Sequence, residues 1–180
     1  MLNSPFLDWN MSPKMEKFFI PIVSFIGWLF PNLTIMKGSN AVGCYAQSLL
    51  KQYKGEWNFN PNWKMPKGHP IKAGWIHAIT SAQRSLHKGG KINCPILVLS
   101  STRSFPETNT WNEEYHNCDI VLDMHDIQNY GAKLGNYVTR YTIPNGIHDL
   151  ILSKETARRQ VYYTYFNWLD KITHSFGGMK

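Results

Sequence analysis

The sequence predicts an α/β fold built around a parallel sheet, and three features of residues 94–152 lead to this prediction. Residues 95–101 form a short apolar run behind a proline, which is typical of a strand buried on both faces. Residues 137–143 are rich in β-branched and aromatic side chains and precede a Pro-Asn-Gly turn, which indicates a second strand. A helix between these strands completes a βαβ unit, whose two strands run parallel with a right-handed crossover.

The connecting helix carries its own start and stop signals. Asp123 suits the N-cap, and Asp126, three residues later, can complete an acidic capping arrangement. Gly135 suits the position that ends the helix. Four positions share one apolar face at helical spacing: Met124, Ile127, Gly131 and Leu134.

The first part of the chain contains its most apolar stretch, residues 18–30. An extended segment, residues 2–6, precedes it, and Ser12 and Pro13 suit the cap and first residue of a helix. The stretch is only 13 residues long, whereas a membrane-spanning helix needs about 20 apolar residues. Two interpretations remain, an ordinary buried helix and part of a lid whose apolar face touches lipid or substrate.

The middle of the chain, residues 32–68, shows no strong hydrophobic period and holds a turn-rich aromatic loop. Trp57 and Trp63 in this loop could stack on a ligand, although the default is that they pin the loop to the domain. A helix is expected after Pro70, ended by Gly89 and Gly90. Its apolar stripe consists of Trp75, Ala78, Ile79, Ala82 and Leu86.

The last helix is expected to follow Ser153 as its cap and to cover the sheet, with residues 175–180 as a tail. Its apolar positions are Val161, Tyr165, Trp168, Leu169 and Ile172.

Composition indicates one globular domain with a basic surface. The 180 residues are 43% hydrophobic, and 19 basic against 12 acidic residues give a net charge of +7. The basic residues are spread out, with no run longer than Arg158-Arg159, so a nucleic-acid function ranks last. Three widely spaced cysteines indicate a reduced, cytoplasmic compartment, with Cys94 packed beside the first buried strand.

Three segments resemble the C-terminal third of α/β hydrolases: residues 95–99, 119–123 and 146–150. The grouping they most resemble is that of the serine hydrolases known as monoacylglycerol lipase, lysophospholipase and serine aminopeptidase, and the resemblance covers nearly the whole chain. It implies that residues 1–9 end a core strand region, residues 10–92 form a mostly helical lid and residues 93–174 form the C-terminal part of the core. No cofactor is implied.

The resemblance also implies two members of a Ser–Asp–His triad. His148 follows the last strand and matches the catalytic histidine; the alternative is a loop histidine bonded to backbone. Asp119 matches the acid through its Asp-x-Val-apolar setting. It stands farther from its strand than the family acid does, with residues 102–118 between them and Ser104 where the family often carries Asp.

Other ionisable residues compete with this assignment. Asp123 is the second choice of acid, although capping already gives it a structural role, and Asp149 is expected to point away from the His148 ring. His116 and Cys118 beside Asp119 lack the paired spacing of a zinc site, so no metal is expected.

The nucleophile of this fold sits in a Gly-x-Ser-x-Gly turn, and no such pentad occurs in the sequence. We therefore expect the C-terminal part of a serine hydrolase acting on a carboxylic ester (acylglycerol or lysophospholipid-like) or a small peptide-like amide. Such a chain is inactive alone and needs an N-terminal half or self-association. The alternative is an inactive remnant that serves as a packing or lipid-contacting module. The expected substrate or lid contacts are Phe18, Phe19, Phe25, Trp28, Trp57 and Trp63.

Overall fold

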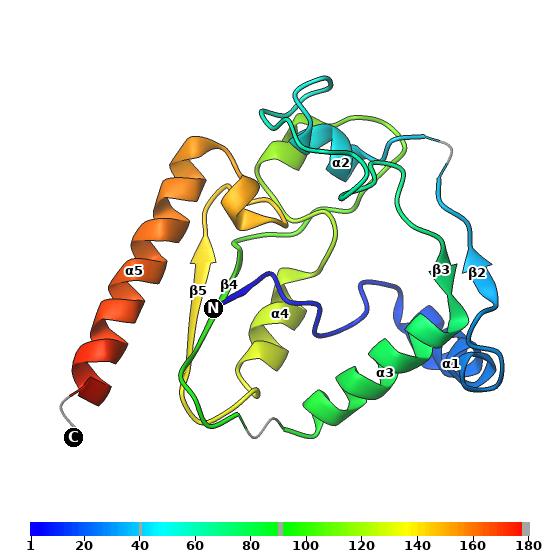
Figure 1. Ribbon diagram of the computed structural model, residues 1–180, viewed down its shortest axis with the longest axis horizontal. Helices are drawn as coiled ribbons and strands as arrows, with labels where there is room; N and C mark the ends of the chain where they lie inside the picture. The colour runs from blue at the N-terminus through cyan, green and yellow to red at the C-terminus, as the bar shows by residue number, and fades with distance from the viewer. Residues whose placement is uncertain (40, 90–91, 178–180) are drawn as a thin grey trace.

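Three parallel strands form the sheet that positions the rest of the chain. A computed structural model describes residues 1–39, 41–89 and 92–177 (Figure 1). Its strands are β1 (Leu2–Asn3), β4 (Ile96–Ser101) and β5 (Val138–Ile143), in the order β1-β4-β5. Leu2 pairs with Val98, and Ile96 pairs with Val138. The α/β fold with a parallel sheet is thereby confirmed.

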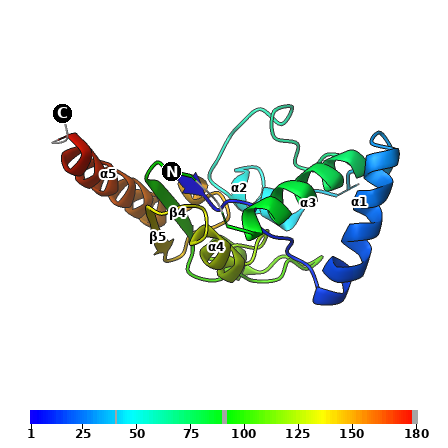
Figure 2. The same ribbon diagram turned by 90° about the horizontal axis from the view of Figure 1, so that it is seen from below.

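The central strand β4 is covered on both faces, which explains why its sequence is apolar without alternation. Ile96 and Val98 pack toward α4 (Met124–Gly131), whereas Leu97 and Leu99 pack toward α5 (Glu155–Gly177). In Figure 2, β4 and β5 lie between these two helices. The result is a helix–sheet–helix arrangement with one core on each side of the strand.

Helix α4 begins where the sequence predicts and ends earlier. The Asp123 carboxylate caps it by accepting the N–H of His125 at 2.7 Å. The helix ends at Gly131, so the prediction that Gly135 ends it is wrong. Gly135 instead lies where the chain passes Ile92, and a Cβ at this position would stand 2.2 Å from the Ile92 carbonyl oxygen. Close backbone approach, not helix termination, is what requires glycine here.

Helix α5 packs on the sheet through its first half. Ala157 and Val161 are buried, and Tyr165 and Trp168 are partly buried against the same core. The expected cap, Ser153, is wrong: its hydroxyl accepts the N–H of Ile147, six residues back along the chain. The helix itself starts at Glu155 and continues to Gly177, so the expected tail lies partly in the helix and partly outside the described residues.

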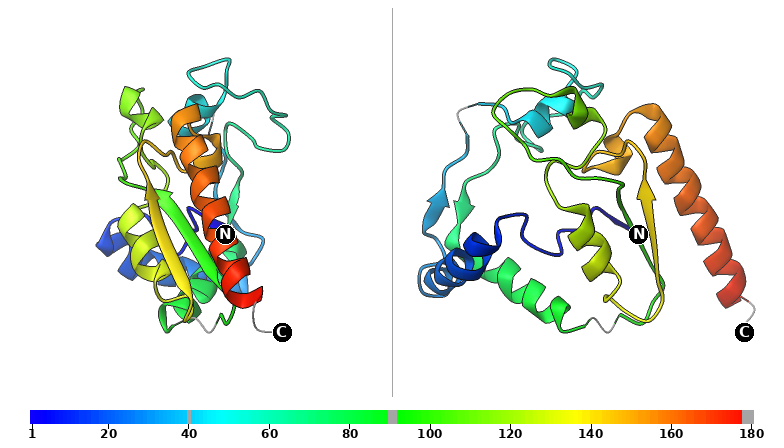
Figure 3. Two further views of the ribbon diagram at one scale, coloured as in Figure 1. Left: turned by 90° about the vertical axis from the view of Figure 1, so that its left-hand side faces the viewer. Right: turned by 180° about the vertical axis from the view of Figure 1, so that it is seen from behind.

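A second group of elements lies on the opposite side of the molecule from α5 (Figure 3). It comprises the π-helix η1 (Met15–Phe19), α1 (Ile20–Leu29), the antiparallel pair β2 (Thr34–Met36) and β3 (Ile71–Lys72), and α3 (Ala73–His87).

Helices α1 and α3 cross at a point where small residues let their backbones meet. A Cβ on Gly27 of α1 would stand 2.1 Å from the Ala73 carbonyl oxygen. The buried positions of α3 are Ala73, Ile76, Thr80 and Gln83. The predicted apolar stripe is therefore wrong for Trp75, Ala78 and Ala82, which are exposed. Of the two residues expected to end the helix, Gly90 lies outside the described residues.

Three short helices gather near the carboxyl end of the sheet: α2 (Cys44–Leu49), η2 (Glu113–His116) and η3 (Leu150–Leu152). Cys44 of α2 and Cys118 share a buried cluster with Tyr115. Cys94 is exposed, so the prediction that it packs beside the strand is wrong. It lies in a bend two residues before β4 begins, ahead of the buried part of the run.

Candidate active site

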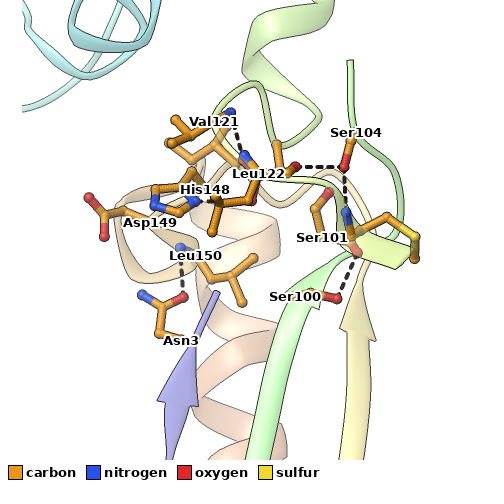
Figure 4. Close-up of polar contacts among 12 residues, drawn as sticks. Asn3, Ser100, Ser101, Ser104, Val121, Leu122, His148, Asp149 and Leu150 are labelled. Carbon is orange, nitrogen blue, oxygen red and sulfur yellow. Dashed lines mark hydrogen bonds and ion pairs between the residues drawn. The ribbon is translucent and has the colours of Figure 1, made fainter. Parts of the chain in front are cut away.

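His148 stands on a tightly held turn after β5. Asn145 adopts a left-handed backbone conformation (φ 57°), which asparagine tolerates better than most residues, and the N–H of Gly146 returns to the Ile143 carbonyl at 3.2 Å. The N–H of Ile147 donates to the buried Ser153 hydroxyl at 3.0 Å. These contacts aim His148 at the edge of the sheet, beyond the end of the strands (Figure 4).

Asp119 is fully buried, and hydrogen bonds to both of its carboxylate oxygens fix its side chain in one orientation. One carboxylate oxygen, Oδ1, accepts the N–H groups of Val121 and Leu122 at 2.8 and 2.9 Å. The other, Oδ2, lies 3.0 Å from Nδ1 of His148. An ionised carboxylate only accepts, so Nδ1 carries the hydrogen and Nε2 is the nitrogen that can take a proton from a third group.

The segment between β4 and Asp119 leaves the sheet and returns to it. The N–H of Asp119 donates to the Arg103 carbonyl at 3.1 Å, and the N–H of Phe105 donates to the Asp119 carbonyl at 2.9 Å. Ser104 and Asp119 form a parallel bridge, and the Ser104 hydroxyl donates to the Leu122 carbonyl at 2.8 Å. Asp119 is therefore adjacent in space to Ser104, the position at which the sequence resemblance leads one to look for the acid.

The two competing carboxylates have other partners. Asp123 caps α4. Asp149 accepts the Tyr45 hydroxyl at 2.6 Å and forms an ion pair with Lys64, so it points away from the His148 ring as expected. Burial acts most strongly on the pKa of Asp149 and raises it, but the hydrogen bonds from Lys64 and Tyr45 outweigh burial and leave this pKa below its ordinary value.

An open cleft of about 370 Å³ lies beside His148. Its lining is mainly aromatic and aliphatic and comes from four separate parts of the chain: Phe6, Trp9, Asn10, Met11, Trp75, Val121, Leu122 and His148. Such a cleft suits an apolar group placed next to the histidine. Sequence reasoning missed the aromatic members Phe6, Trp9 and Trp75, because no short-range pattern links segments that meet only in the folded chain.

The predicted lid residues of the first apolar stretch lie on an exposed face. Phe18, Phe25 and Trp28 expose 60 to 64% of their surface, and Phe19 exposes 41%. Among the described residues, none of these four lines the cleft beside His148. The opposite face of α1 is buried at Ile20, Val23, Ser24 and Gly27. The helix is therefore two-sided, and its aromatic side faces outward.

The two tryptophans of the aromatic loop differ. Trp57 donates its indole N–H to the Leu152 carbonyl at 2.7 Å, and the Arg158 guanidinium lies 4.9 Å from its ring centroid. It therefore pins the loop to η3, which agrees with the default interpretation. Trp63 is 86% exposed.

The residues weighed as metal ligands do not converge. The Cys118 thiol donates to the Glu114 carbonyl at 2.9 Å, and the His116 ring packs edge-on against Trp111 at 5.0 Å. Within residues 1–39, 41–89 and 92–177, no three metal-ligating side chains gather. In the same ranges, no helix is long and apolar enough to cross a membrane.

Comparison with known proteins identifies the fold. No family model matches the sequence, and no curated protein matches it. Among solved structures, the chain is similar to a monoacylglycerol lipase of Paleococcus ferrophilus, with a TM-score of 0.54 and 18% identity. The match covers 93% of this chain and 56% of the lipase, so the chain spans little more than half the lipase's length. The likeness shows that the chain has the fold of part of an α/β hydrolase.

Proposed function

We propose that this chain supplies the acid and the base of a serine hydrolase. The observation that carries the proposal is the Asp119–His148 pair, a fully buried carboxylate 3.0 Å from Nδ1 of the histidine. The pair stands at the carboxyl edge of a parallel sheet, where open α/β folds bind their ligands. The similarity in fold to a lipase adds support.

In the proposed reaction, a serine hydroxyl from outside this chain attacks the carbonyl carbon of the substrate. His148 accepts the serine proton at Nε2, and the resulting imidazolium is stabilised by Asp119 through Nδ1–H. His148 then gives the proton to the leaving oxygen or nitrogen, and an acyl-enzyme forms. Water, activated by the same nitrogen, hydrolyses the acyl-enzyme. No cofactor takes part in these steps.

The proposed substrate is a carboxylic ester of the acylglycerol or lysophospholipid type, with a small peptide-like amide as the second choice. The apolar cleft beside His148 supports an ester whose acyl chain packs on Phe6, Trp9 and Trp75. We assign residues 10–92 as the lid and residues 93–174 as the core. Three free cysteines support a reducing, cytoplasmic location.

The proposal places the serine and the oxyanion donors in a segment ahead of residue 1. The test is hydrolysis of short p-nitrophenyl esters by this chain alone and by the chain joined to the polypeptide encoded immediately upstream. We expect turnover only in the joined form, and we expect it to disappear in His148→Ala. Turnover by the chain alone that is lost in His148→Ala would contradict the placement of the nucleophile.

A second candidate function, a catalytically inactive lipid-contacting module, is favoured by the outward face of η1 and α1. This face carries Phe18, Phe25 and Trp28, and Lys17 lies 5.9 Å from the Phe18 ring centroid. Aromatic side chains beside basic ones suit an anionic lipid surface. Sedimentation with anionic vesicles tests this function: we expect binding by the chain and loss of binding in Phe25→Ser/Trp28→Ser, whether or not hydrolysis occurs.

A further inference from the structure

A polar cluster beside the His148 ring connects the proposed lid to His148, the proposed base. The Tyr45 ring packs edge-on against the His148 imidazole, with 5.7 Å between centroids and an interplanar angle of 78°. The Tyr45 hydroxyl donates to Asp149 at 2.6 Å. Lys64 forms an ion pair with the same Asp149 oxygen and lies 5.2 Å from the Tyr45 ring centroid. We call Tyr45, Lys64 and Asp149 the brace.

The brace joins segments that are far apart in the chain. Tyr45 comes from α2 and Lys64 from the loop ahead of β3, whereas Asp149 follows His148 directly. The loop that carries Lys64 has a second anchor nearby, because Trp57 donates to the Leu152 carbonyl of η3. The segment between residues 44 and 64 thus contacts the stretch after β5 at His148, Asp149 and Leu152.

Two carboxylates are candidates to pair with His148, and only Asp119 bonds its ring, whereas the Asp149 carboxylate is bound by Tyr45 and Lys64. Asp119 is buried and prearranged by two backbone N–H groups. Asp149 is adjacent in sequence and its side chain is 30% exposed. Without Tyr45 and Lys64, the Asp149 side chain would be free to turn toward the imidazole and compete for its N–H, and a ring turned toward Asp149 would lose the Asp119 bond. The side chain of Lys64 neutralises the Asp149 charge, and the Tyr45 hydroxyl occupies the same oxygen.

We infer that Tyr45 and Lys64 are positioning residues that neutralise and hold Asp149 so that His148 pairs with Asp119 alone. Of the charged and titratable groups in this arrangement, Asp119 and Tyr45 contact the His148 ring, and Tyr45 and Lys64 both bind Asp149. The orientation of the base therefore depends on the docking of the 44–64 segment onto the core. This inference rests on the proposed function for its catalytic meaning, although the contacts themselves do not.

The test measures the Nδ1–H proton of His148 by NMR on the chain as it stands, without substrate. A hydrogen bond to a buried carboxylate gives this proton a downfield resonance that is protected from exchange. We expect the resonance in the unmodified chain and its loss in Lys64→Met. We expect Asp149→Asn to restore it in Lys64→Met/Asp149→Asn, because no charge then remains to be compensated.

The matched control is Lys67→Met, which removes an equal charge from an exposed lysine of the same loop. It should leave the resonance in place. Where Lys64→Met does not fold, Tyr45→Phe serves instead, because it keeps the ring against His148 and removes only the hydroxyl; we expect faster exchange of the same proton.

Persistence of the resonance in folded Lys64→Met, or unchanged exchange in Tyr45→Phe, would overturn the inference. Failure of Asp149→Asn to restore the resonance would do so as well, since it would mean that Lys64 acts through packing rather than charge. Because the test measures no turnover, its result can contradict the positioning role of Tyr45 and Lys64 without contradicting the proposed ester hydrolysis. Equally, the NMR result can support the positioning role of the brace even if no ester hydrolysis is detected.

Discussion

At the scale of single residues, Asp119 has two separable tasks. One oxygen holds the loop by accepting the N–H groups of Val121 and Leu122, and the other faces His148. Asparagine can keep a neutral acceptor toward the two N–H groups but cannot stabilise an imidazolium. The two tasks therefore respond differently to the same substitution.

In an active form completed by the proposed serine-bearing segment, Asp119→Asn should lower kcat by about 10³- to 10⁴-fold and leave KM near its starting value. The physical reason is that the carboxylate acts on the charged imidazolium, which forms only in the transition state. Steady-state kinetics with a p-nitrophenyl ester measures both constants. Asp123→Asn is the matched control, because Asp123 caps α4 and lies outside the pair. A severe kcat defect in the control together with a mild one in Asp119→Asn would reverse the assignment of the acid.

The lowered pKa of Asp149 makes a prediction about stability and pH. The native state keeps this carboxylate ionised at a pH where the unfolded chain already binds a proton, so stability increases with pH in that range. Its contribution is complete above the ordinary value of 3.8 and is lost as pH falls through the lower native pKa. Urea midpoints should show the unmodified chain above Asp149→Asn at neutral pH, with the two converging in acid. A difference that grows on acidification would contradict the assignment.

The cysteines predict a simple count of reactive thiols. Burial raises the pKa of Cys118 to about 11 and also raises the pKa of Cys44 above its ordinary value, whereas Cys94 is exposed. Ellman's reagent should therefore label one thiol rapidly in the native chain and all three in denaturant, and Cys94→Ser should abolish the rapid phase. Rapid labelling that survives in Cys94→Ser would contradict this exposure pattern.

The distance along the chain between contacting residues explains which parts of the candidate site can be predicted from the sequence. The position of His148 after β5 and the capping role of Asp123 follow from local order, because a strand, a turn or a helix start lies next to each of them. Tyr45 and Lys64 meet Asp149 across 104 and 85 residues, and no local period records such a contact. Asp119 is an intermediate case. The residue and its apolar neighbours can be read from the sequence, but backbone hydrogen bonds with Arg103 and Phe105 bring Asp119 back to the end of β4.

At the scale of elements, the crossing of α1 and α3 depends on backbone proximity. Gly27 has the Ala73 carbonyl where its Cβ would stand. Gly27→Val should force the helices apart and lower the free energy of unfolding by about 3 kcal/mol, at the upper end of typical overpacking costs. Thermal or urea unfolding measures the loss. Ile22→Val on the exposed face of the same helix is the control, expected within about 0.5 kcal/mol of the parent. Equal stability of Gly27→Val and the control would show that the helices do not meet as closely as described.

The same crossing shows why helix faces were harder to predict than helices. A hydrophobic stripe assigns Trp75 inward, but α3 packs on α1 through Ala73 and Ile76, because small residues allow the closer approach. Trp75 then lies at the surface, stacked on Phe6 and lining the cleft. Periodicity identified the helix, whereas the size of the side chains at the contact decided which way it faces.

At the scale of the whole molecule, the sheet ends in two edges. The order β1-β4-β5 leaves β1 and β5 each paired on one side within the described residues. An open strand edge promotes association with other chains. The exposed aromatic face of η1 and α1 adds apolar surface to this tendency.

We therefore expect the isolated chain to self-associate at micromolar concentration, and analytical ultracentrifugation measures this directly. Addition of the proposed serine-bearing segment should shift the distribution toward a single species by covering the β1 edge. A clean monomer with a sharp cooperative melt in the absence of any partner would contradict the expectation.

The pairing of Leu2 with Val98 also sets an order of events during synthesis. The first strand leaves the ribosome long before the strand on which it must lie, and nearly a hundred residues separate the two. Until β4 emerges, Leu2 cannot make its described pairing with Val98, so the helical pair α1 and α3 can form first. Only then can β1 settle beside β4, where the Asn3 side-chain oxygen accepts the N–H of Leu150 at 3.2 Å. Within these 180 residues, β1 is thus made well before β4 but can take its described place only after β4 has been made.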